Sequence, residues 1–258
     1  MPDDYGAQSA LAERSGSPIR IELTQAISRA WKGLGACGTW WSAKQRIAIA
    51  AETRQAADCE ICTERLRAVS PAMIARQHEG NSLLPAWAVE AVHAIASDPR
   101  RLHRGWYDRL KQSGMAEEEY AELVSVVAVT IAADTYWRAV GALPAAFPTP
   151  AAGDPTRHRP RGARYGLAWM QTLAPEDREA CDPDLYQESP GPRRRGGGNI
   201  HRALSLVPAA MMDWWDLFEK MYMTSVEMRD FSREYRSISH AQIEFLASRV
   251  AVANRCFY

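Results

Sequence analysis

Hydrophobic positions along most of the chain recur at helical spacing. After Ser42-Ala-Lys-Gln45, apolar residues advance every three or four positions, and the same spacing follows Ser239-His-Ala-Gln242. A serine with a glutamine three residues later is the capping-box signature of a helix start, so both helices have a defined first residue. The sustained apolar–polar alternation of half-buried strands is missing from the chain. The pattern therefore predicts an all-α fold.

Further helices are predicted between these two. The stretch Met115–Val140 begins with acidic residues and is apolar nearly all round its middle, which is typical of a buried helix. A second long helical stretch runs from about Pro208 to Arg236, and Asp98-Pro99 has the N-cap and first-turn proline of another helix start.

Residues 144–198 differ from the rest of the chain. Nine of the fifteen prolines lie between Pro144 and Pro192, and the stretch ends in Arg193-Arg-Arg-Gly-Gly-Gly198. This composition predicts an ordered loop or linker, with at most a short helix near 165–172. The arginines are interpreted as part of a solvated connection rather than as a phosphate or partner site. The predicted organisation is an N-terminal helical domain at 17–143, a linker at 144–198 and a C-terminal domain at 199–258.

The two capping boxes belong to a longer internal repeat. A constant offset of 197 aligns residues 42–61 with residues 239–258. The coinciding pairs are Ser42/Ser239, Gln45/Gln242, Ala50/Ala247, Ala56/Ala253 and Cys59/Cys256. The first copy contains a complete Cys59-Glu-Ile-Cys62, whereas the partner of Cys62 in the second copy would be residue 259. We therefore expect two tandem copies, the second cut off inside its Cys-x-x-Cys motif.

Composition and charge narrow the class of protein. The 258 residues are 47% hydrophobic and 24% charged, which is typical of a globular protein. With 31 basic and 31 acidic residues the net charge is zero, which argues against nucleic acid or an anionic membrane as a partner. No apolar run approaches the roughly 20 residues of a membrane span, and the N-terminus has no signal-peptide pattern. The expected location is the cytoplasm.

The cysteines favour redox chemistry over metal binding. Five cysteines are too few and too scattered for a secreted disulfide framework, and a Cys-x-x-Cys pair in a reducing compartment is catalytic or metal-binding. Zinc normally needs two more ligands at similar spacing, but Cys37 and Cys181 stand alone and none of the six histidines forms a pair with three to five residues between its members. We therefore predict no metal site. No flavin, haem or nicotinamide motif is visible, so we expect no cofactor and a thiol partner as the reductant.

The spacing of Cys59 and Cys62 suits a dithiol. Two thiols separated by two residues fit one helical turn, close enough for one to attack a substrate and the other to resolve the product as a disulfide. Asp58 is the predicted N-cap of a new helix, with both cysteines in its first turn. The partial positive charge of a helix start stabilises a thiolate.

At this point the sequence resembles a known family. Asn199-Ile-His-Arg-Ala-Leu with Pro208 nearby, Glu244 twelve residues before Cys256, and Asn254-Arg-Cys-Phe-Tyr258 are similar to motifs of the AhpD-like alkyl hydroperoxidases, in the carboxymuconolactone decarboxylase superfamily. The resemblance is specific from Asn199 to the end and looser at 21–143. It implies an all-helical AhpD-like bundle, peroxide-reducing or thiol–disulfide chemistry, and assembly into homo-oligomers such as trimers or hexamers.

The resemblance also implies roles for individual residues. The second cysteine of the family motif attacks the peroxide, the first resolves the disulfide, and a glutamate and a histidine relay protons. Carried onto this chain, it makes Glu244 a proton acceptor and Cys256 a resolving thiol, and it makes Cys59 and Cys62 a complete thiol pair. The N-terminal copy departs from the pattern, because Ile47 stands where the glutamate should be and Leu66 where the histidine should be. The candidate catalytic residues are Cys59, Cys62, Glu244 and Cys256.

Other polar and aromatic residues have plainer interpretations. Glu52, seven residues before Cys59, is in reach to replace the missing glutamate, but we interpret it as a solvated side chain. His93 and His103 are interpreted as core or surface histidines rather than as members of a proton relay. The tryptophan pairs at 40–41 and 214–215 are expected to fill the core or an interface.

Three explanations are open for a chain that stops one residue short of the second Cys-x-x-Cys. They are an accident of cloning or annotation, a natural nonsense codon, and a selenocysteine at position 259 encoded by UGA. A selenolate would suit the peroxide-attacking position.

The expected function is therefore a thiol-dependent, or selenol-dependent, antioxidant peroxidase or thiol–disulfide oxidoreductase. Its substrate would be a peroxide or a disulfide. Two alternatives stay open: a lyase like carboxymuconolactone decarboxylase, which would not need the cysteine pair, and a non-catalytic remnant.

Overall fold

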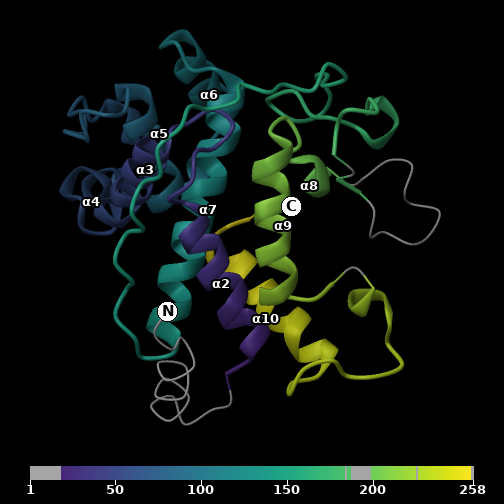
Figure 1. Ribbon diagram of the computed structural model, residues 1–258. Coiled ribbons are helices and arrows are strands. Elements are labelled where there is room, and N and C mark those ends of the chain that lie inside the picture. The colour runs from purple at the N-terminus through teal and green to yellow at the C-terminus, as the bar shows by residue number, and fades with distance from the viewer. Residues whose placement is uncertain (1–18, 184, 187–198, 225, 257–258) are drawn as a thin grey trace.

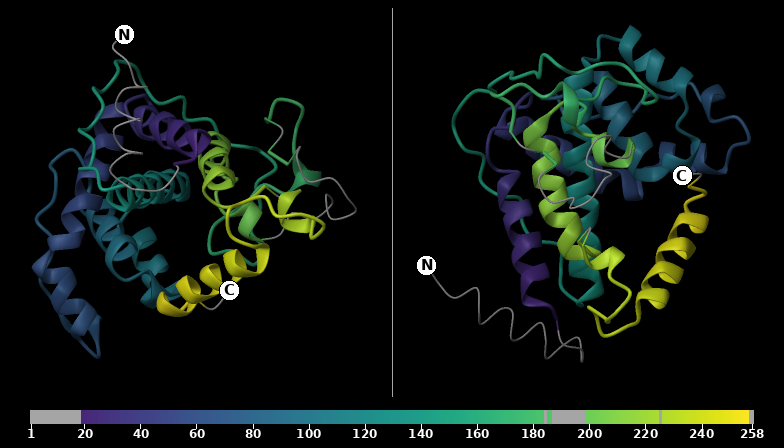
Figure 2. Two further views of the ribbon diagram at one scale, coloured as in Figure 1. Left: turned by 90° about the horizontal axis from the view of Figure 1, so that it is seen from below. Right: turned by 90° about the vertical axis from the view of Figure 1, so that its right-hand side faces the viewer.

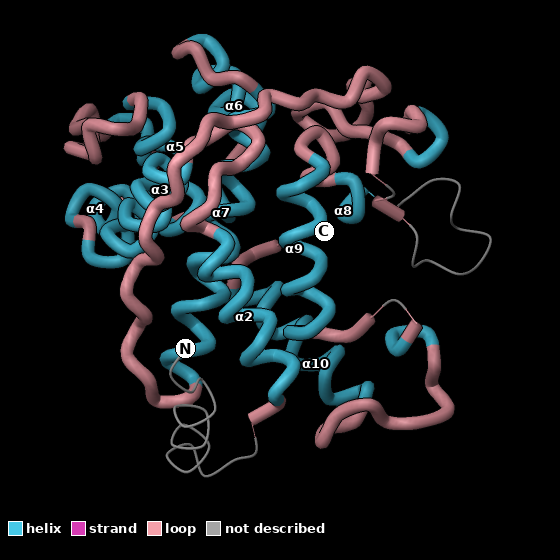
Figure 3. Tube along the Cα trace, viewed as in Figure 1, coloured by secondary structure: helices cyan, strands magenta, loops and turns pink. Residues whose placement is uncertain are grey.

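The computed structural model describes residues 19–183, 185–186, 199–224 and 226–256, and within these ranges the chain is helical (Figures 1 and 3). In this described part no strand forms, apart from an isolated antiparallel bridge between Arg164 and Thr172. The all-α prediction is confirmed there. None of the helices found in these ranges combines the length and apolarity needed to cross a membrane.

The α-helices and 3-10 turns follow one another in a simple order. In the first part these are α2 (Ile21–Gly33), α3 (Ala43–Gln55), η1 (Ala56–Asp58), α4 (Glu60–Arg67), η2 (Pro71–Met73), α5 (Ala86–Ser97), η3 (Pro99–Arg101), α6 (Arg104–Gln112) and α7 (Glu117–Ala139). They continue with η4 (Pro175–Asp177), α8 (Asn199–Arg202), α9 (Pro208–Met221), η6 (Glu227–Arg229) and α10 (His240–Ala253).

The core lies around α7, which confirms the prediction of a buried helix at 115–140. On one side α7 packs against α3 and α5, which also contact each other, and on the other side it packs against α2 and α9 (Figure 2). The hydrophobic cluster is continuous across these helices and includes Leu206, Val207 and Leu217 next to or within α9. Residues from before and after the Pro-rich segment therefore share one core.

A buried polar contact fixes the start of α3 against α7. The Glu122 carboxylate of α7 accepts the backbone N–H of Trp40 at 2.6 Å and lies 3.5 Å from the Arg46 guanidinium. Arg46 in turn donates to the carbonyls of Gly33 and Ala36. A Cβ at Gly38 would lie 1.5 Å from a Glu122 carboxylate oxygen, so a larger residue there would push the carboxylate out of this position. Burial raises the pKa of Glu122, and the Trp40 N–H and the Arg46 guanidinium offset part of that effect.

Two predicted helix boundaries are wrong. The helix expected from Pro208 to about Arg236 ends at Met221, because Thr224 and Glu227 cap each other and start a separate turn at η6. At Asp98-Pro99 only the short turn η3 forms. The α-helix α6 starts later, with the His103 side chain accepting the backbone N–H of Trp106.

Much of the Pro-rich segment is ordered by contacts with the bundle. Backbone N–H groups of Ala151 and Arg157 donate to the carbonyls of Gly35 and Thr39, at 2.7 and 2.8 Å. Leu173 is fully buried. The short helix expected near 165–172 does not form, since the chain makes the Arg164–Thr172 bridge there instead. The stretch Arg193–Gly198 lies outside the described residues.

Both predicted capping boxes are present. Ser42 accepts the backbone N–H of Gln45, and the Gln45 side chain accepts the backbone N–H of Ser42. Ser239 and Gln242 make the same reciprocal pair. The two helices nevertheless differ in their surroundings, because α3 is part of the core whereas no residue of α10 is buried.

Candidate functional site

The turn between α3 and α4 positions the two cysteines. The 3-10 turn η1 continues directly from α3, and Cys59, with extended backbone, is the N-cap of α4. The prediction that Asp58 would cap this helix is wrong, since Asp58 is the last residue of η1. Cys62 is then the third residue of α4, close to the positive end of the helix dipole.

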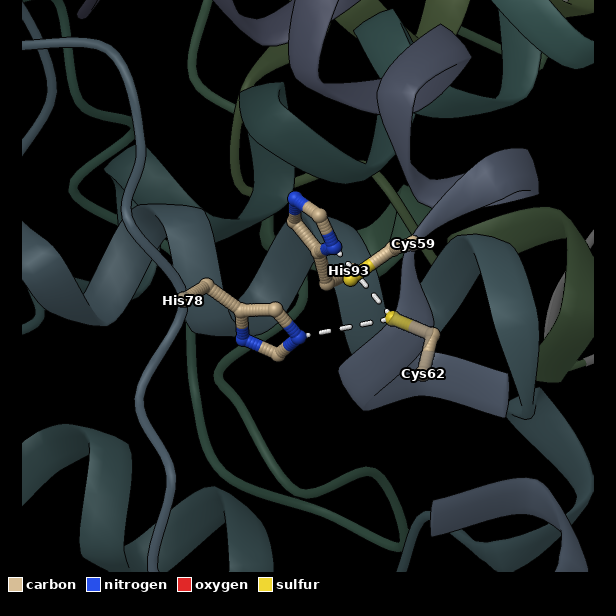
Figure 4. Close-up of side chains that lie close together, drawn as sticks. All are labelled: Cys59, Cys62, His78 and His93. Carbon is tan, nitrogen blue, oxygen red and sulfur yellow. Dashed lines mark hydrogen bonds between the residues drawn. The ribbon is translucent and has the colours of Figure 1, made fainter. Parts of the chain in front are cut away.

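Two histidines from later in the chain meet the Cys62 thiol. His93 lies on α5, and His78 lies in the loop between η2 and α5. The Cys62 Sγ is 3.2 Å from His93 Nδ1 and 3.4 Å from His78 Nε2 (Figure 4). The Cys59 sulfur joins them, so that one sulfur or nitrogen atom of each of the four residues lies within 4.8 Å of the others. This group of Cys59, Cys62, His78 and His93 is called the Cys/His cluster below.

A carboxylate holds the far side of each imidazole. Glu52 Oε2 is 3.1 Å from His93 Nε2, while its Oε1 accepts the backbone N–H of Asn81 at 2.5 Å. Glu90 Oε2 is 2.9 Å from His78 Nδ1. Because a carboxylate only accepts hydrogen bonds, these contacts place the ring proton of each neutral histidine on the carboxylate side. The lone pairs of His93 Nδ1 and His78 Nε2 then point toward Cys62.

Burial and charge set the protonation of the site. Burial raises the pKa of the Cys62 thiol to about 11, so the free thiol is protonated at neutral pH. Burial also lowers the pKa of His93, which favours its neutral form. Burial alone would raise the pKa of Glu90, but His78 and Arg65 outweigh it and lower that pKa. The Arg65 guanidinium donates to Glu90 Oε1 at 2.6 Å.

The site opens on a cavity of about 580 Å³. Cys62 and His78 line it, whereas Cys59 and His93 are not among its lining residues. Its wall combines apolar side chains with arginines; the lining includes Pro71, Ile74, Trp106, Leu110, Arg65, Arg101 and Arg109. A volume of this size suits a small organic ligand. Cys62 is therefore the cysteine that a ligand in the cavity would meet.

The sequence interpretation of Glu52 is wrong. The residue is 1% exposed, because it lies on the face of α3 that packs toward α5. His93 is buried in the core, one of the two places expected for it, and His103 is exposed at the start of α6. A polar residue within an apolar stripe is the signal that would have singled out His93 in Ala86–Ser97. His78 lies in an irregular loop and carries no comparable signal.

The second pair of predicted catalytic residues lies elsewhere. Glu244 is on α10, where it accepts a hydrogen bond from the Tyr222 hydroxyl at 2.6 Å and lies 3.6 Å from the His240 imidazole. Cys256 is exposed, three residues beyond the end of α10. The structure thus brings Cys59 and Cys62 together, and the Cys/His cluster contains neither Glu244 nor Cys256.

The remaining cysteines are free thiols away from this cluster. Cys37 is half-buried in the loop before α3 and Cys181 is exposed. Comparisons of the chain with family models, with curated proteins and with solved structures gave no match.

Proposed function

We propose that the protein is a thiol-dependent peroxidase or thiol–disulfide oxidoreductase, with Cys62 as the nucleophile and Cys59 as the resolving thiol. The observation that carries this proposal is the continuous path from Glu52 through His93 to the Cys62 sulfur. A nucleophile, a base within hydrogen-bond reach and a carboxylate that orients the base form the arrangement that activates thiols and hydroxyls in other enzymes.

The first step is a proton transfer within this path. In the resting site burial keeps Cys62 protonated and His93 neutral, so the proton passes from the Cys62 thiol to His93 Nδ1 as the sulfur attacks the substrate. The Glu52 carboxylate stabilises the resulting imidazolium through Nε2–H. The start of α4 favours the thiolate that is left behind.

Peroxide reduction then follows in two steps. The Cys62 thiolate attacks the terminal oxygen of the hydroperoxide, so that a sulfur–oxygen bond forms and the oxygen–oxygen bond breaks. The alkoxide takes the proton from His93 and leaves as an alcohol, while Cys62 becomes a sulfenic acid. The Cys59 thiol attacks this sulfur, the disulfide forms and water leaves. A dithiol partner reduces the disulfide and is itself oxidised. The reducing cytoplasm, which the sequence predicts as the location, would supply such a partner.

With a disulfide as substrate, the Cys62 thiolate would attack one of its sulfurs and form a mixed disulfide. Cys59 would then displace the substrate as a thiol and leave the Cys59–Cys62 disulfide.

The cavity favours an organic hydroperoxide over hydrogen peroxide. Trp106 and Leu110 give part of the wall an apolar surface, and hydrogen peroxide would use little of the available volume. We expect cumene hydroperoxide to react with a higher kcat/KM than hydrogen peroxide.

We also propose that the chain contains two copies of an AhpD-like unit. The support is the shared capping box at an offset of 197 residues, with a cysteine at the same distance from each. In the second unit, Glu244 and Cys256 occupy the positions that the resemblance gives to the proton acceptor and the resolving thiol, but neither belongs to the Cys/His cluster, so the proposed turnover rests on the first unit.

The test is peroxide consumption by the full chain with dithiothreitol as reductant. Cys62→Ser should abolish turnover. In a separate reaction of the reduced chain without dithiothreitol, Cys59→Ser should reduce one equivalent of peroxide and leave a sulfenic acid that dimedone labels at Cys62. Cys37→Ser and Cys181→Ser are the matched controls and should turn over like the parent chain. Turnover that survives in Cys62→Ser would contradict the proposal, and a lyase activity that survives there would favour the decarboxylase alternative.

A further inference from the structure

Two histidine nitrogens face the Cys62 sulfur, and the thiol proton can satisfy only one of them. Glu52 and Glu90 direct the lone pairs of two imidazole nitrogens at the same sulfur. A thiol has one proton and donates to only one of them. The other nitrogen would face sulfur lone pairs unless it carries its own proton or both share a metal ion. An extra proton on that nitrogen would form a hydrogen bond between it and the sulfur, and so would involve two atoms of the Cys/His cluster. A metal ion would bind all four ligand atoms.

The distances suit a tetrahedral ion. Zinc binds sulfur at about 2.3 Å and imidazole nitrogen at about 2.0 Å, which puts sulfur and nitrogen roughly 3.5 Å apart across a tetrahedron. The observed distances from Cys62 Sγ to the two nitrogens are 3.2 and 3.4 Å. All four ligand atoms are within 4.8 Å of one another, so small side-chain movements would complete the site.

The surroundings of the cluster also match those of a metal centre. Histidine ligands usually donate their second ring N–H to a carboxylate or carbonyl, which orients the ring and raises its basicity. Both histidines have such a carboxylate here, at 2.9 and 3.1 Å. Two thiolates would balance the charge of a divalent ion. Side chains of this kind select zinc over magnesium or calcium, which prefer oxygen ligands.

We propose that Cys59, Cys62, His78 and His93 bind one Zn²⁺ ion per chain when the cysteines are reduced. This site goes beyond the proposed redox function, because it adds His78 and needs no peroxide. Four protein ligands leave no open position, which is typical of a structural zinc site. The ion would join the loop that carries His78 to α4 and α5.

Zinc and the proposed redox chemistry would exclude each other. Zinc binding displaces both thiol protons and occupies the sulfur electron pairs that a peroxide would meet. A disulfide between Cys59 and Cys62 would in turn remove both thiolate ligands. The zinc-bound chain is therefore expected to resist oxidation and alkylation at Cys62.

The test is a titration of the reduced, metal-free full chain with Co²⁺, followed by displacement with Zn²⁺. We expect one Co²⁺ per chain, with the visible absorption of tetrahedral cobalt and a thiolate charge-transfer band, and loss of both when Zn²⁺ is added. Glu90→Gln should weaken binding by about 10- to 100-fold, and His78→Gln by at least as much. Cys37→Ser and Cys181→Ser should bind like the parent chain.

A second readout uses the parent chain, so it does not depend on whether a variant folds. Zn²⁺ should slow the alkylation of Cys62 by iodoacetamide in the parent chain, measured by peptide mass spectrometry, and leave Cys181 as reactive as before. The absence of tetrahedral cobalt bands, or unchanged binding in a folded His78→Gln chain, would overturn the inference.

The result also separates this inference from the proposed function. A chain that reduces peroxide but shows neither the cobalt bands nor protection by Zn²⁺ overturns only the metal site. A chain that binds Zn²⁺ with these signatures but never reduces peroxide supports the metal site and contradicts only the redox proposal.

Discussion

Residues 42–62 and 239–256 share a capping box and a cysteine at the same distance from it, yet their surroundings differ. The first region packs between α5 and α7, and its Cys62 is 5% exposed beside two histidines. The second has no buried residue in its helix, and its Cys256 is exposed. A local sequence signal therefore determines where a helix starts, but partners from elsewhere in the chain determine whether its cysteine lies in a built site.

The glutamates of the two regions, Glu52 and Glu244, also differ in their surroundings. In the first region Glu52 points to His93, and its counterpart at the offset of 197 is Arg249. In the second region Glu244 is half exposed, and its counterpart is Ile47. The two regions therefore place their carboxylates at different positions along the helix, and only the first directs one at a histidine that contacts a cysteine.

The largest expected contrast concerns the two cysteines. Cys62→Ser should lower peroxide turnover by about 10³-fold or more, because it removes the proposed nucleophile. Cys256→Ser is the comparison and should have little effect, since Cys256 has no such surroundings. Dithiothreitol-coupled peroxide consumption measures both. A larger loss in Cys256→Ser than in Cys62→Ser would reverse the assignment of the site.

The next contrast concerns the carboxylates. Glu52→Gln should lower kcat/KM for cumene hydroperoxide by about 10²- to 10⁴-fold, because His93 loses the acceptor that orients it and stabilises its charged form. Glu244→Gln should change kcat/KM by less than about threefold. Circular dichroism is the control for folding. Equal decreases of kcat/KM in the two variants would show that the path from Glu52 through His93 to Cys62 does not carry the protons.

A third contrast compares packing at matched positions. Ile49 is fully buried in α3, whereas Leu246, its counterpart in α10, is 54% exposed. Ile49→Ala should lower the free energy of unfolding by about 2–5 kcal/mol, and Leu246→Ala by less than about 0.5 kcal/mol. Urea denaturation measures both. A large decrease in the free energy of unfolding in Leu246→Ala would mean that the apolar side chains of α10 are buried in solution.

The smallest contrast concerns the caps. Ser42→Ala and Ser239→Ala each remove one side-chain acceptor at a helix start, a loss of about 1 kcal/mol. The first should lower the global stability, since α3 belongs to the core. The second should only increase amide exchange in the first turn of α10, measured by hydrogen–deuterium exchange. A global loss from Ser239→Ala would show that α10 unfolds together with the bundle.

Several features were predictable because they depend on neighbours in sequence. The helical period identified α7, and the serine–glutamine pairs identified the first residues of α3 and α10. The Cys-x-x-Cys motif singled out Cys59 and Cys62. The boundaries at 98 and 221 were missed because local caps at His103 and Thr224 outweighed the helical pattern.

The rest of the candidate site was not predictable in this way. His78 lies 16 residues after Cys62, and His93 lies 31 after it. No spacing rule connects residues across a loop whose path is set by packing. Glu52 was predicted to be a solvated side chain because a charged residue in a helix is usually exposed. His93 on α5 and the Asn81 backbone make it a buried hydrogen-bond acceptor.

The sequence by itself determined the helical class of the described chain, the starts of the two matched helices and the pair of thiols, because each depends on interactions within a few residues. The tertiary structure alone decided that one thiol pair meets two histidines, each held by a carboxylate. It also decided that α3 is buried and α10 is not. These depend on contacts between distant segments, whose burial strengthens hydrogen bonds and charges that water would otherwise weaken.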